Sequence, residues 1–399
     1  MTTEPTAERL SPLHDEHVAL GAHLTSFGGW QMPLRYTSDL AEHRSVREAA
    51  GLFDLSHMGE IEVVGPEAAA ALDRALVGHL SAVAVGRARY TMLCAEDGSV
   101  LDDLVVYRLE DERFLVVANA GNADLVAREL VDRAAGLDAV VTDRGSETAL
   151  VAVQGPLAEE IVAALVERRQ DSTGEAGGVQ TIRNMKYYAA ATVTLTVDDG
   201  ALDALVARTG YTGEDGFELF VPTGRASALW RTVLAAGRPH GLVPAGLSAR
   251  DSLRLEAGMP LYGHELDTTT TPYEAGLGRV VKLDKTAADG APLPFVGRDA
   301  LAARKASPPP RVLVGLRGVG RRPARAGYGV VLPRGGGEAP RVGSVTSGAP
   351  SPTLGYPIAM AYVTPELSAE GTELAVDVRG RLEPVVVVPL PFYRRPQRP

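Results

Sequence analysis

A glycine-rich segment followed directly by a strand-like run constrains this chain more than any other feature. Residues 208–218 read Arg-Thr-Gly-Tyr-Thr-Gly-Glu-Asp-Gly-Phe-Glu, and the run continues to Val221. Glycine permits positive φ and lets the backbone pass close to a ligand. Strand alternation puts Phe217 and Val221 on one face and Glu218 on the other. The segment is therefore either a surface hairpin with a solvated Glu218, or a turn that presents this carboxylate to a heterocycle with adjacent N–H groups.

The composition is that of a soluble globular protein. The chain has 399 residues, of which 45% are hydrophobic and 23% charged. This length suggests two or three domains. We find no apolar run long enough to span a membrane. The first ten residues are polar and mixed in charge, unlike a secretory or transit peptide. We therefore expect a cytoplasmic protein with no membrane partner.

Charge, cysteine and histidine usage exclude several classes of function. The net charge of -10 argues against general affinity for nucleic acid. A single cysteine, Cys94, rules out an intrachain disulfide and a cysteine-rich metal site, and we expect it to be a buried structural thiol. His57 and His264 do not show a ligand spacing such as HExxH, so we expect no metal.

The periodicity of the chain predicts an α+β region followed by an all-β module. The α+β region covers residues 8–282, a Pro-containing connection covers 283–310, and short Val-rich segments separated by Gly and Pro cover 311–393. We expect helices at 12–24, 39–51, 66–77, 122–136 and 226–237, strands at 90–94, 100–109, 114–119, 149–153, 190–196 and 217–221, and a loop at 167–180.

Two consecutive hairpins between residues 90 and 119 bring polar side chains to one end of a small sheet. If Cys94 pairs with Val100, Asp103 falls opposite Thr91 and next to Tyr90. Directly opposed residues lie within about 5.5 Å, and diagonal ones remain in reach. One bulge would shift this register by a residue.

The second hairpin adds an amide to the same place. If Leu109 pairs with Phe114, Asp103 falls opposite Ala120 and next to Asn119. A phenol, a carboxylate and an amide that converge in this way can bind a polar ligand. The alternative for Asp103 is a strand-end acid that faces water.

A cation stands near the start of a helix predicted after residue 248. Ser248 is expected to be its N-cap, with Asp251 at the third helical position. Arg250 then lies in the first turn, where a positive charge interacts unfavourably with the helix dipole and costs about 0.3–1 kcal/mol. Arg250 therefore either contacts an anionic or carbonyl partner, or pairs with Glu256 or another acid.

Several blocks, together with residues 208–218, resemble the aminomethyltransferase (T protein) family of the glycine cleavage system. They occur in the family's order and span nearly the whole chain. The blocks are Gly29-Trp30-Gln31-Met32-Pro33, Phe53-Asp54-Leu55-Ser56-His57-Met58, Leu101-Asp102-Asp103-Leu104, Gln154-Gly155-Pro156, Ala249 to Gly258, Gly343 to Gly348 and Ser351-Pro352-Thr353-Leu354.

The resemblance implies a fold and a reaction. The family has three domains around a central cavity, the last of them a β-barrel. Its members transfer the methylene carbon of an aminomethyl group on the lipoylated H protein to tetrahydrofolate. Ammonia and 5,10-methylenetetrahydrofolate are the products, and neither a metal nor a covalent intermediate is needed.

The resemblance also assigns roles to residues. Asp103, at the third position of its block, matches the catalytic acid, which would stabilise positive charge near the folate nitrogens. The expected folate-binding residues are Met58, Tyr90, Asn119, Tyr188, Glu218, Arg250 and Tyr393. Of these, Glu218 would hold the pterin ring.

Two alternatives and one departure accompany the resemblance. A related tetrahydrofolate-dependent demethylase, or a folate domain of an oxidising enzyme, is disfavoured by the complete 208–218 block and the lack of a Gly-rich dinucleotide motif. A non-catalytic iron–sulfur assembly factor would carry a KGCYxGQE-type motif, which is absent, and here Asp103 is present. Segment 195–206 is longer than usual in the family.

The resemblance implies that the lipoylated H protein is the carrier and that it is typically acidic, so basic clusters are its candidate docking sites. A protein of net charge -10 would repel such a carrier unless it presented a local positive patch. Two clusters are available, and either is otherwise an ordinary solvated loop: Arg321, Arg322 and Arg325, and Arg394, Arg395 and Arg398.

Overall fold

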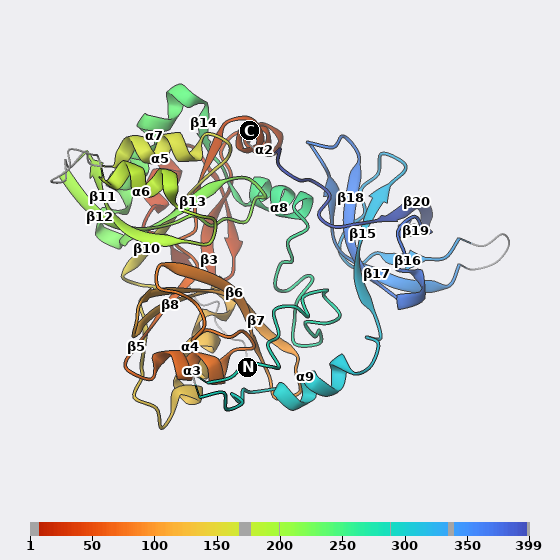
Figure 1. Cartoon of the computed structure of the whole chain (residues 1–399). Helices are drawn as coiled ribbons and strands as arrows, with labels where there is room; N and C mark the ends of the chain where they lie inside the picture. Colours follow the sequence, from red (N-terminus) through yellow and green to blue (C-terminus); the bar gives the residue numbers. More distant parts are fainter. Residues whose placement is uncertain (1–7, 167–176, 199, 288, 334–338, 397–399) are drawn as a thin grey trace, which may run out of the picture.

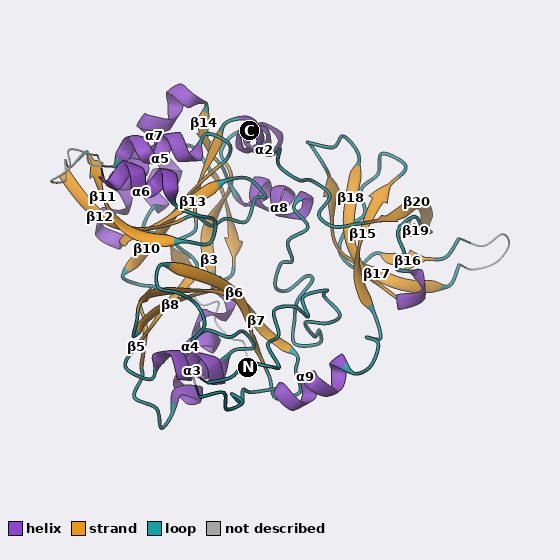
Figure 2. Ribbon diagram, in the orientation of Figure 1, coloured by secondary structure: helices purple, strands orange, loops and turns teal. Residues whose placement is uncertain are grey.

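The chain forms two stacked α+β units and a β-barrel beside them (Figure 1). The computed structural model describes residues 8–166, 177–198, 200–287, 289–333 and 339–396. The predicted α+β class and the C-terminal all-β module are both confirmed. Figure 2 shows that helices lie on the outer faces of the two units, whereas the barrel consists mainly of strands.

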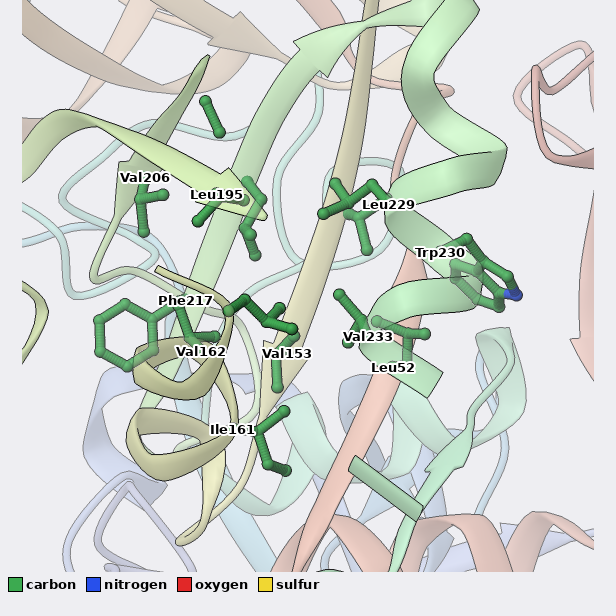
Figure 3. Packing of buried hydrophobic residues seen from close by; sticks show 14 of the residues in the cluster. Leu52, Val153, Ile161, Val162, Leu195, Val206, Phe217, Leu229, Trp230 and Val233 are labelled. Atoms are coloured by element: carbon green, nitrogen blue, oxygen red, sulfur yellow. The ribbon is translucent and has the colours of Figure 1, made fainter. Parts of the chain in front are cut away.

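The first sheet lies in the upper unit of Figure 1, and three helices cover one of its faces. Its strand order is β11 (Ala190–Val197), β12 (Gly200–Ala207), β13 (Gly216–Pro222), β10 (Thr148–Gln154), β4 (Ala50–Asp54) and β14 (Leu242–Pro244). The helices are α5 (Ala158–Leu165), α6 (Gly177–Asn184) and α7 (Ala226–Gly237). Strand alternation points Val153 and Phe217 toward the helices, where Ile161 and the buried Trp230 meet this face (Figure 3).

The second sheet forms the lower unit. Its strand order is β6 (Arg87–Cys94), β7 (Val100–Glu110), β8 (Arg113–Ala118), β5 (Gly59–Val64) and β9 (Val140–Asp143). Helices α3 (Ala68–Ala75) and α4 (Ala123–Ala134) pack on the face that carries Ile61, Val63, Leu104 and Val106. Alternate residues of the same strands therefore point to the opposite face, toward the first sheet.

The inner faces of the two sheets share a third core. Phe53, Leu150 and Phe220 of the first sheet lie in one buried cluster with Tyr107 and Val117 of the second. Some residues point to the inner faces of the sheets but lie at the edge of this cluster. Their side chains are available to line a cavity between the units.

The barrel closes the C-terminal region, and helix α8 (Leu247–Glu256) is one of the elements that fasten it to the first unit. The barrel order is β15 (Val312–Gly318), β18 (Pro357–Val363), β17 (Arg341–Pro350), β16 (Gly329–Val331), β19 (Glu373–Val378) and β20 (Arg381–Val388). Helix α8 packs Leu255 against Ile358 and Met360. The buried Arg254 also donates to Ser347 Oγ of the barrel at 2.8 Å.

The remaining elements are short. They are β1 (Arg9–Leu10), α1 (His14–Ala19), β2 (His23–Phe27), β3 (Trp30–Arg35), α2 (Asp39–Glu48), α9 (Arg298–Lys305), and the single-turn helices η1 (Ala120–Asn122), η2 (Thr223–Arg225), η3 (Arg238–His240) and η4 (Pro365–Leu367). Lys285 ties the segment before α9 to the second unit, because its buried ammonium donates to the carbonyls of Leu76 at 2.7 Å and Gly78 at 3.0 Å.

Three predicted elements differ from the structure. The helix expected at 12–24 ends at Ala19, because Gly21 takes a φ of 72° and the chain turns back into β2. The segment expected to be a connection, 283–310, contains α9. Residues 177–180 of the expected loop begin α6, and residues 167–176 lie outside the described part of the chain.

The structure supports the expectation for Cys94, a buried free thiol whose pKa burial raises to about 12. Among the described residues, no helix is both long and apolar enough to cross a membrane.

Candidate functional site

A cavity of about 480 Å³ lies between the two sheets and is closed by residues of α8 and the segment after it. It is where the structure brings most of the predicted site residues together. The predicted residues that line it are Met58, Tyr90, Asp103, Asn119, Tyr188, Glu218 and Arg250. Within the described chain, Tyr393 is the one predicted site residue that does not line this cavity.

Asp103 is held between the two partners that the hairpins suggested. Tyr90 donates its hydroxyl hydrogen to Asp103 Oδ2 at 2.9 Å, and Asn119 Nδ2 donates to Asp103 Oδ1 at 2.9 Å. In β6 and β7, Tyr90 pairs with Val105 and Met92 with Asp103, so Tyr90 and Asp103 are diagonal neighbours on one face.

The register nevertheless differs by one residue from the expected one in both hairpins. Asp103 lies opposite Met92, not Thr91, because a bulge between Leu93 and Cys94 absorbs a residue next to the turn. In the second hairpin Phe114 pairs with Arg108, not Leu109, because a second irregularity precedes Glu110. The first shift puts Tyr90 and Asp103 on the same face as diagonal neighbours, and the second brings Asp103 opposite Asn119.

Burial sets the electrostatics of the two adjacent acids. It raises the pKa of Asp103 to about 6, against the opposing effect of the hydrogen bonds from Tyr90 and Asn119. Burial, and then the negative charge of Asp103, raises the pKa of Asp102 to about 7. Both carboxyls therefore change charge close to neutral pH.

Glu218 occupies the opposite wall, as strand alternation predicted. Phe217 points into the helix-covered core, and Glu218 points into the cavity. Tyr107 donates its hydroxyl hydrogen to Glu218 Oε2 at 3.2 Å, and Thr209 Oγ1 donates to the same oxygen. Across the part of the chain that the structure describes, Glu218 Oε1 accepts no hydrogen bond, so one oxygen is left for a ligand.

Arg250 lies close to Glu218 without forming an ion pair. Its guanidinium stands 4.7 Å from the centre of the Tyr211 ring, and burial lowers its pKa. No carboxylate of the described residues is within 4.0 Å of it; Glu256, the suggested alternative partner, binds Arg47 at 2.8 Å. Arg250 is thus a cation at the cavity wall with an aromatic neighbour in place of a counter-ion.

The helix that carries Arg250 begins differently from the prediction. Its N-cap is Gly246, and Ser248 is already inside the helix. Glu42 Oε2 accepts the Gly246 N–H at 2.9 Å, so a distant carboxylate binds the backbone at the start of the helix. A side chain at Gly246 would overlap the backbone of Leu34, which explains why glycine stands there.

Tyr188 is placed by a strained backbone. Its φ is 60°, in the left-handed region that is costly for a bulky residue. Its N–H donates to Arg208 O at 3.0 Å, and its carbonyl accepts from Ala88 N at 2.9 Å. These bonds join the first sheet to the second and hold the Tyr188 ring at the cavity, edge-on to Tyr187 at 4.9 Å.

Tyr393 lies on the barrel side of the glycine-rich segment. The Arg47 guanidinium stands 4.0 Å from the centre of its ring. Arg47 in turn pairs with Glu214 at 2.9 Å and Glu256 at 2.8 Å, and Tyr393 N donates to the Glu256 carbonyl at 2.8 Å. In this arrangement Tyr393 supports the wall instead of lining it.

Sequence reasoning missed several cavity residues. Thr209 and Tyr211 stand inside the glycine-rich segment, and attention to their hydroxyl groups could have found them. Tyr107 follows Asp103 with the same strand periodicity, which is a second available signal. Phe27 and Tyr262 reach the cavity from distant segments, and no local sequence pattern predicts that they line it.

The two histidines considered for metal binding do not belong to a cluster of metal ligands among the described residues. His57 lines the cavity, and its Nδ1 has no hydrogen-bond partner among the residues that the structure describes. Burial lowers the pKa of His57 to about 4, so it is neutral near pH 7. His264 Nδ1 lies 3.1 Å from Thr346 O. Over the described ranges, no group of three or more His, Cys, Asp or Glu side chains could hold a metal ion.

Comparison with known families covers both parts of the chain. The family described as GCVT N-terminal domain matches residues 13–285, and the one described as glycine cleavage T-protein C-terminal barrel domain matches residues 311–394. The chain belongs to the glycine cleavage T-protein family. The family membership that the sequence blocks predicted is therefore confirmed, together with the fold it implied.

Relatives in this family match over nearly their full length. An aminomethyltransferase of Streptomyces avermitilis is 56% identical over 393 residues, which cover 98% of each chain. One from Moorella thermoacetica is 43% identical over 388 residues, which cover 97% of this chain and 98% of the other. The crystal structure of glycine cleavage system aminomethyltransferase T from Bartonella henselae has a TM-score of 0.84 at 35% identity, covering 97% of this chain and 98% of that one.

Proposed function

We propose that this protein is the aminomethyltransferase of a glycine cleavage system. The family and the full-length likeness to aminomethyltransferases support an enzyme of this type. It transfers the methylene carbon of an aminomethyl group, carried on a lipoylated H protein, to tetrahydrofolate. The products are ammonia, 5,10-methylenetetrahydrofolate and the dihydrolipoyl carrier. The observation that carries the proposal is the cavity with Asp103 on one wall and Glu218 on the other.

Glu218 and Arg250 are the proposed folate-binding residues. A pterin ring presents adjacent N–H groups, and the free Oε1 of Glu218 is oriented for them by the bonds that Tyr107 and Thr209 make to Oε2. Arg250 has no counter-ion among the described side chains, which favours a carbonyl or anionic group of the ligand as its partner. Met58, Tyr90, Asn119 and Tyr188 complete the proposed binding surface.

Asp103 is the proposed catalytic residue. Positive charge develops near the folate nitrogens as the carbon is transferred, and a fixed carboxylate at the cavity wall stabilises that charge. Tyr90 and Asn119 fix the orientation of Asp103 before the substrate arrives. With a pKa of about 6, Asp103 is mostly ionised at neutral pH, as this role requires.

The carrier has two candidate docking clusters. Arg395 lies beside the glycine-rich segment, where its guanidinium is 3.5 Å from Asp215 Oδ1. Arg322 lies on the barrel, 3.6 Å from Glu383. We favour the cluster of Arg394 and Arg395, because it adjoins a segment that contributes to the cavity wall. Arg398 lies outside the described residues.

The proposal also retains the expected domain boundaries and location. The boundaries are 8–282, 283–310 and 311–393, and they are supported by the separate core of the barrel. We place the protein in the cytoplasm. A tetrahydrofolate-dependent demethylase and a non-catalytic iron–sulfur assembly factor are the alternatives.

Ammonia release separates these functions. Purified protein is mixed with aminomethylated H protein, with and without tetrahydrofolate, and ammonia and methylenetetrahydrofolate are measured. We expect both products, formed much faster when tetrahydrofolate is present. Failure to form methylenetetrahydrofolate from an active preparation of H protein would overturn the proposal. A demethylase would instead consume an N-methyl substrate, and an assembly factor would bind folate without turnover.

A further inference from the structure

A second carboxylate stands directly behind Asp103. Asp102 is fully buried in β7, next to the proposed catalytic residue. Its Oδ1 accepts hydrogen bonds from Asn119 Nδ2 at 2.9 Å and Asn122 Nδ2 at 2.8 Å, and its Oδ2 accepts from Asn119 N at 3.0 Å. Neighbouring residues of a strand point to opposite faces, so Asp102 reaches these groups from the side away from the cavity.

Asn119 connects the two acids through a single nitrogen. Its Nδ2 lies 2.9 Å from Asp102 Oδ1 and 2.9 Å from Asp103 Oδ1. The same nitrogen is 3.1 Å from Asp103 O. An amide nitrogen has only two hydrogens for these three acceptors, so its position depends on both carboxylates at once. A change at Asp102 must therefore reach Asp103 through Asn119.

Asp102 also fixes the cavity rim that follows β8. The strand ends at Ala118, so the backbone N–H of Asn119 has no ladder partner and is bound by Asp102. The chain then passes through η1 to Asn122, which donates to the same carboxylate. Asn119, Ala120 and Gly121 between these two contacts all line the cavity.

We propose that Asp102 is a positioning residue of the transfer site, which fixes the Asn119 amide between itself and Asp103 and makes the two carboxylates titrate as a pair. This inference rests on the proposed function for its kinetic consequence only. The titratable groups that face the pair are Tyr90 of β6, Tyr188, Tyr211 of the glycine-rich segment and Tyr262 of the segment after α8. The amides of Asn119 and Asn122 also face it. In the described part of the chain, no Lys or Arg forms an ion pair with either acid, so their mutual repulsion is not compensated locally.

The pair has three charge states with distinct consequences. Burial raises both pKa values, and the charge of Asp103 raises that of Asp102 above it, to about 7. Below these values both acids are protonated, and between them Asp103 carries the single negative charge. Above them the second charge appears behind Asn119 and adds to the field at the reacting carbon.

Titration of the carboxyl groups tests the pairing without any turnover. Carbon-13 is introduced at the aspartate side-chain carboxyls, and chemical shifts are followed from pH 4 to 9 in the wild type, Asp102→Asn and Asp103→Asn. Difference spectra assign the two resonances. We expect Asp103→Asn to lower the midpoint of Asp102 by at least about 0.5 pH unit, because a like charge has been removed. An unchanged Asp102 midpoint in this variant overturns the pairing.

Kinetics tests the positioning role. Asp102→Asn should lower kcat about tenfold or more while KM for tetrahydrofolate changes less than about threefold, because Asn119 and Asp103 are misplaced but the folate wall is intact. The upper inflection of the wild-type pH–rate profile, near pH 7, should be lost. Asp111→Asn, an equal change of charge at the exposed far end of the β7–β8 hairpin, should match the wild type.

The two levels of inference fail separately. If the wild type does not form methylenetetrahydrofolate, the proposed function fails, whereas the titration still reports on the pair. If the wild type is active and Asp102→Asn keeps its kcat and its upper inflection, the positioning role is wrong. If Asp102→Asn does not fold, Asp103→Asn still decides the pairing, because it leaves Asp102 in place.

Discussion

The side chain of Gln154 occupies the space that a side chain at Gly210 would need. A Cβ built on Gly210 would overlap the Gln154 amide, and the same holds for Gly216. Gln154 Nε2 donates to Thr209 O at 3.0 Å, and its Oε1 accepts from Thr212 Oγ1 at 2.9 Å. The glycine-rich segment thus packs around a buried amide, which explains why glycine is required at Gly210 and Gly216.

Replacement of Gly210 by alanine should destabilise the protein by about 1–3 kcal/mol, because the new methyl group forces Gln154 out of its place. The thermal unfolding midpoint, measured by calorimetry, should fall by several degrees. Gly224→Ala is the matched control, because nothing lies within 4 Å of a Cβ at that exposed position. A midpoint for Gly210→Ala equal to that of the control would contradict this account of the segment.

Asp103→Asn should preserve the fold and folate binding but lose turnover by roughly 100-fold or more, because it removes the charge that stabilises the transition state. The variant keeps the size of the side chain and its neighbours Tyr90 and Asn119. Ammonia release gives the rate, and calorimetric titration with tetrahydrofolate gives the affinity. Retention of more than about half of the wild-type rate would rule out the electrostatic role.

Glu218→Gln and Arg250→Ala should each weaken tetrahydrofolate binding by about 1.5–3 kcal/mol, because each removes a charge-assisted hydrogen bond. Affinity for the H protein should change much less. Tyr393→Phe is a useful comparison, since its ring lies on Arg47 outside the cavity lining. An unchanged Kd for Glu218→Gln or Arg250→Ala would remove that residue from the proposed site. A raised Kd for Tyr393→Phe would return Tyr393 to the folate-binding residues.

The pH dependence of stability should reveal the two buried acids. Their folded-state pKa values, about 6 for Asp103 and about 7 for Asp102, lie above the ordinary value of 3.8. Each therefore contributes stability that is fully present below pH 3.8 and is lost as the pH rises toward 6 and 7. The unfolding midpoint of Asp103→Asn minus that of the wild type should therefore be more positive at pH 8 than at pH 4. An identical difference in stability between variant and wild type at both pH values would show that the pKa of Asp103 is not raised in the folded protein.

Charge reversal at Arg394 and Arg395 should raise KM for the H protein and leave KM for tetrahydrofolate unchanged, because an acidic carrier would lose its attraction to this patch. The wild-type rate at low carrier concentration should also fall as salt approaches physiological strength, where the Debye length is about 8 Å. Reversal at Arg321 and Arg325 on the barrel is the comparison. If neither double variant changes the carrier KM, the docking surface lies elsewhere.

The sequence by itself determined the family, the fold class and most of the candidate site. Alternation in β13 was enough to place Phe217 and Glu218 on opposite faces, because a strand with one buried face fixes which residues point into the core. The family resemblance then assigned Glu218 to the ligand site, and the structure has it in the cavity wall. The short hairpins were enough to bring Tyr90, Asp103 and Asn119 together, because local pairing limits the possible registers to within a residue.

Tertiary structure decided which groups satisfy one another across long stretches of chain. Glu42, not Ser248, binds the start of α8, because packing brings α2 against that helix end. The bulge between Leu93 and Cys94 fixed the residue that lies opposite Asp103. Because β8 ends at Ala118, the Asn119 N–H is free to donate to Asp102. Tyr393 met Arg47 because the barrel docks beside the glycine-rich segment. Such partners depend on packing between distant segments, which the local alternation of polar and apolar residues does not encode.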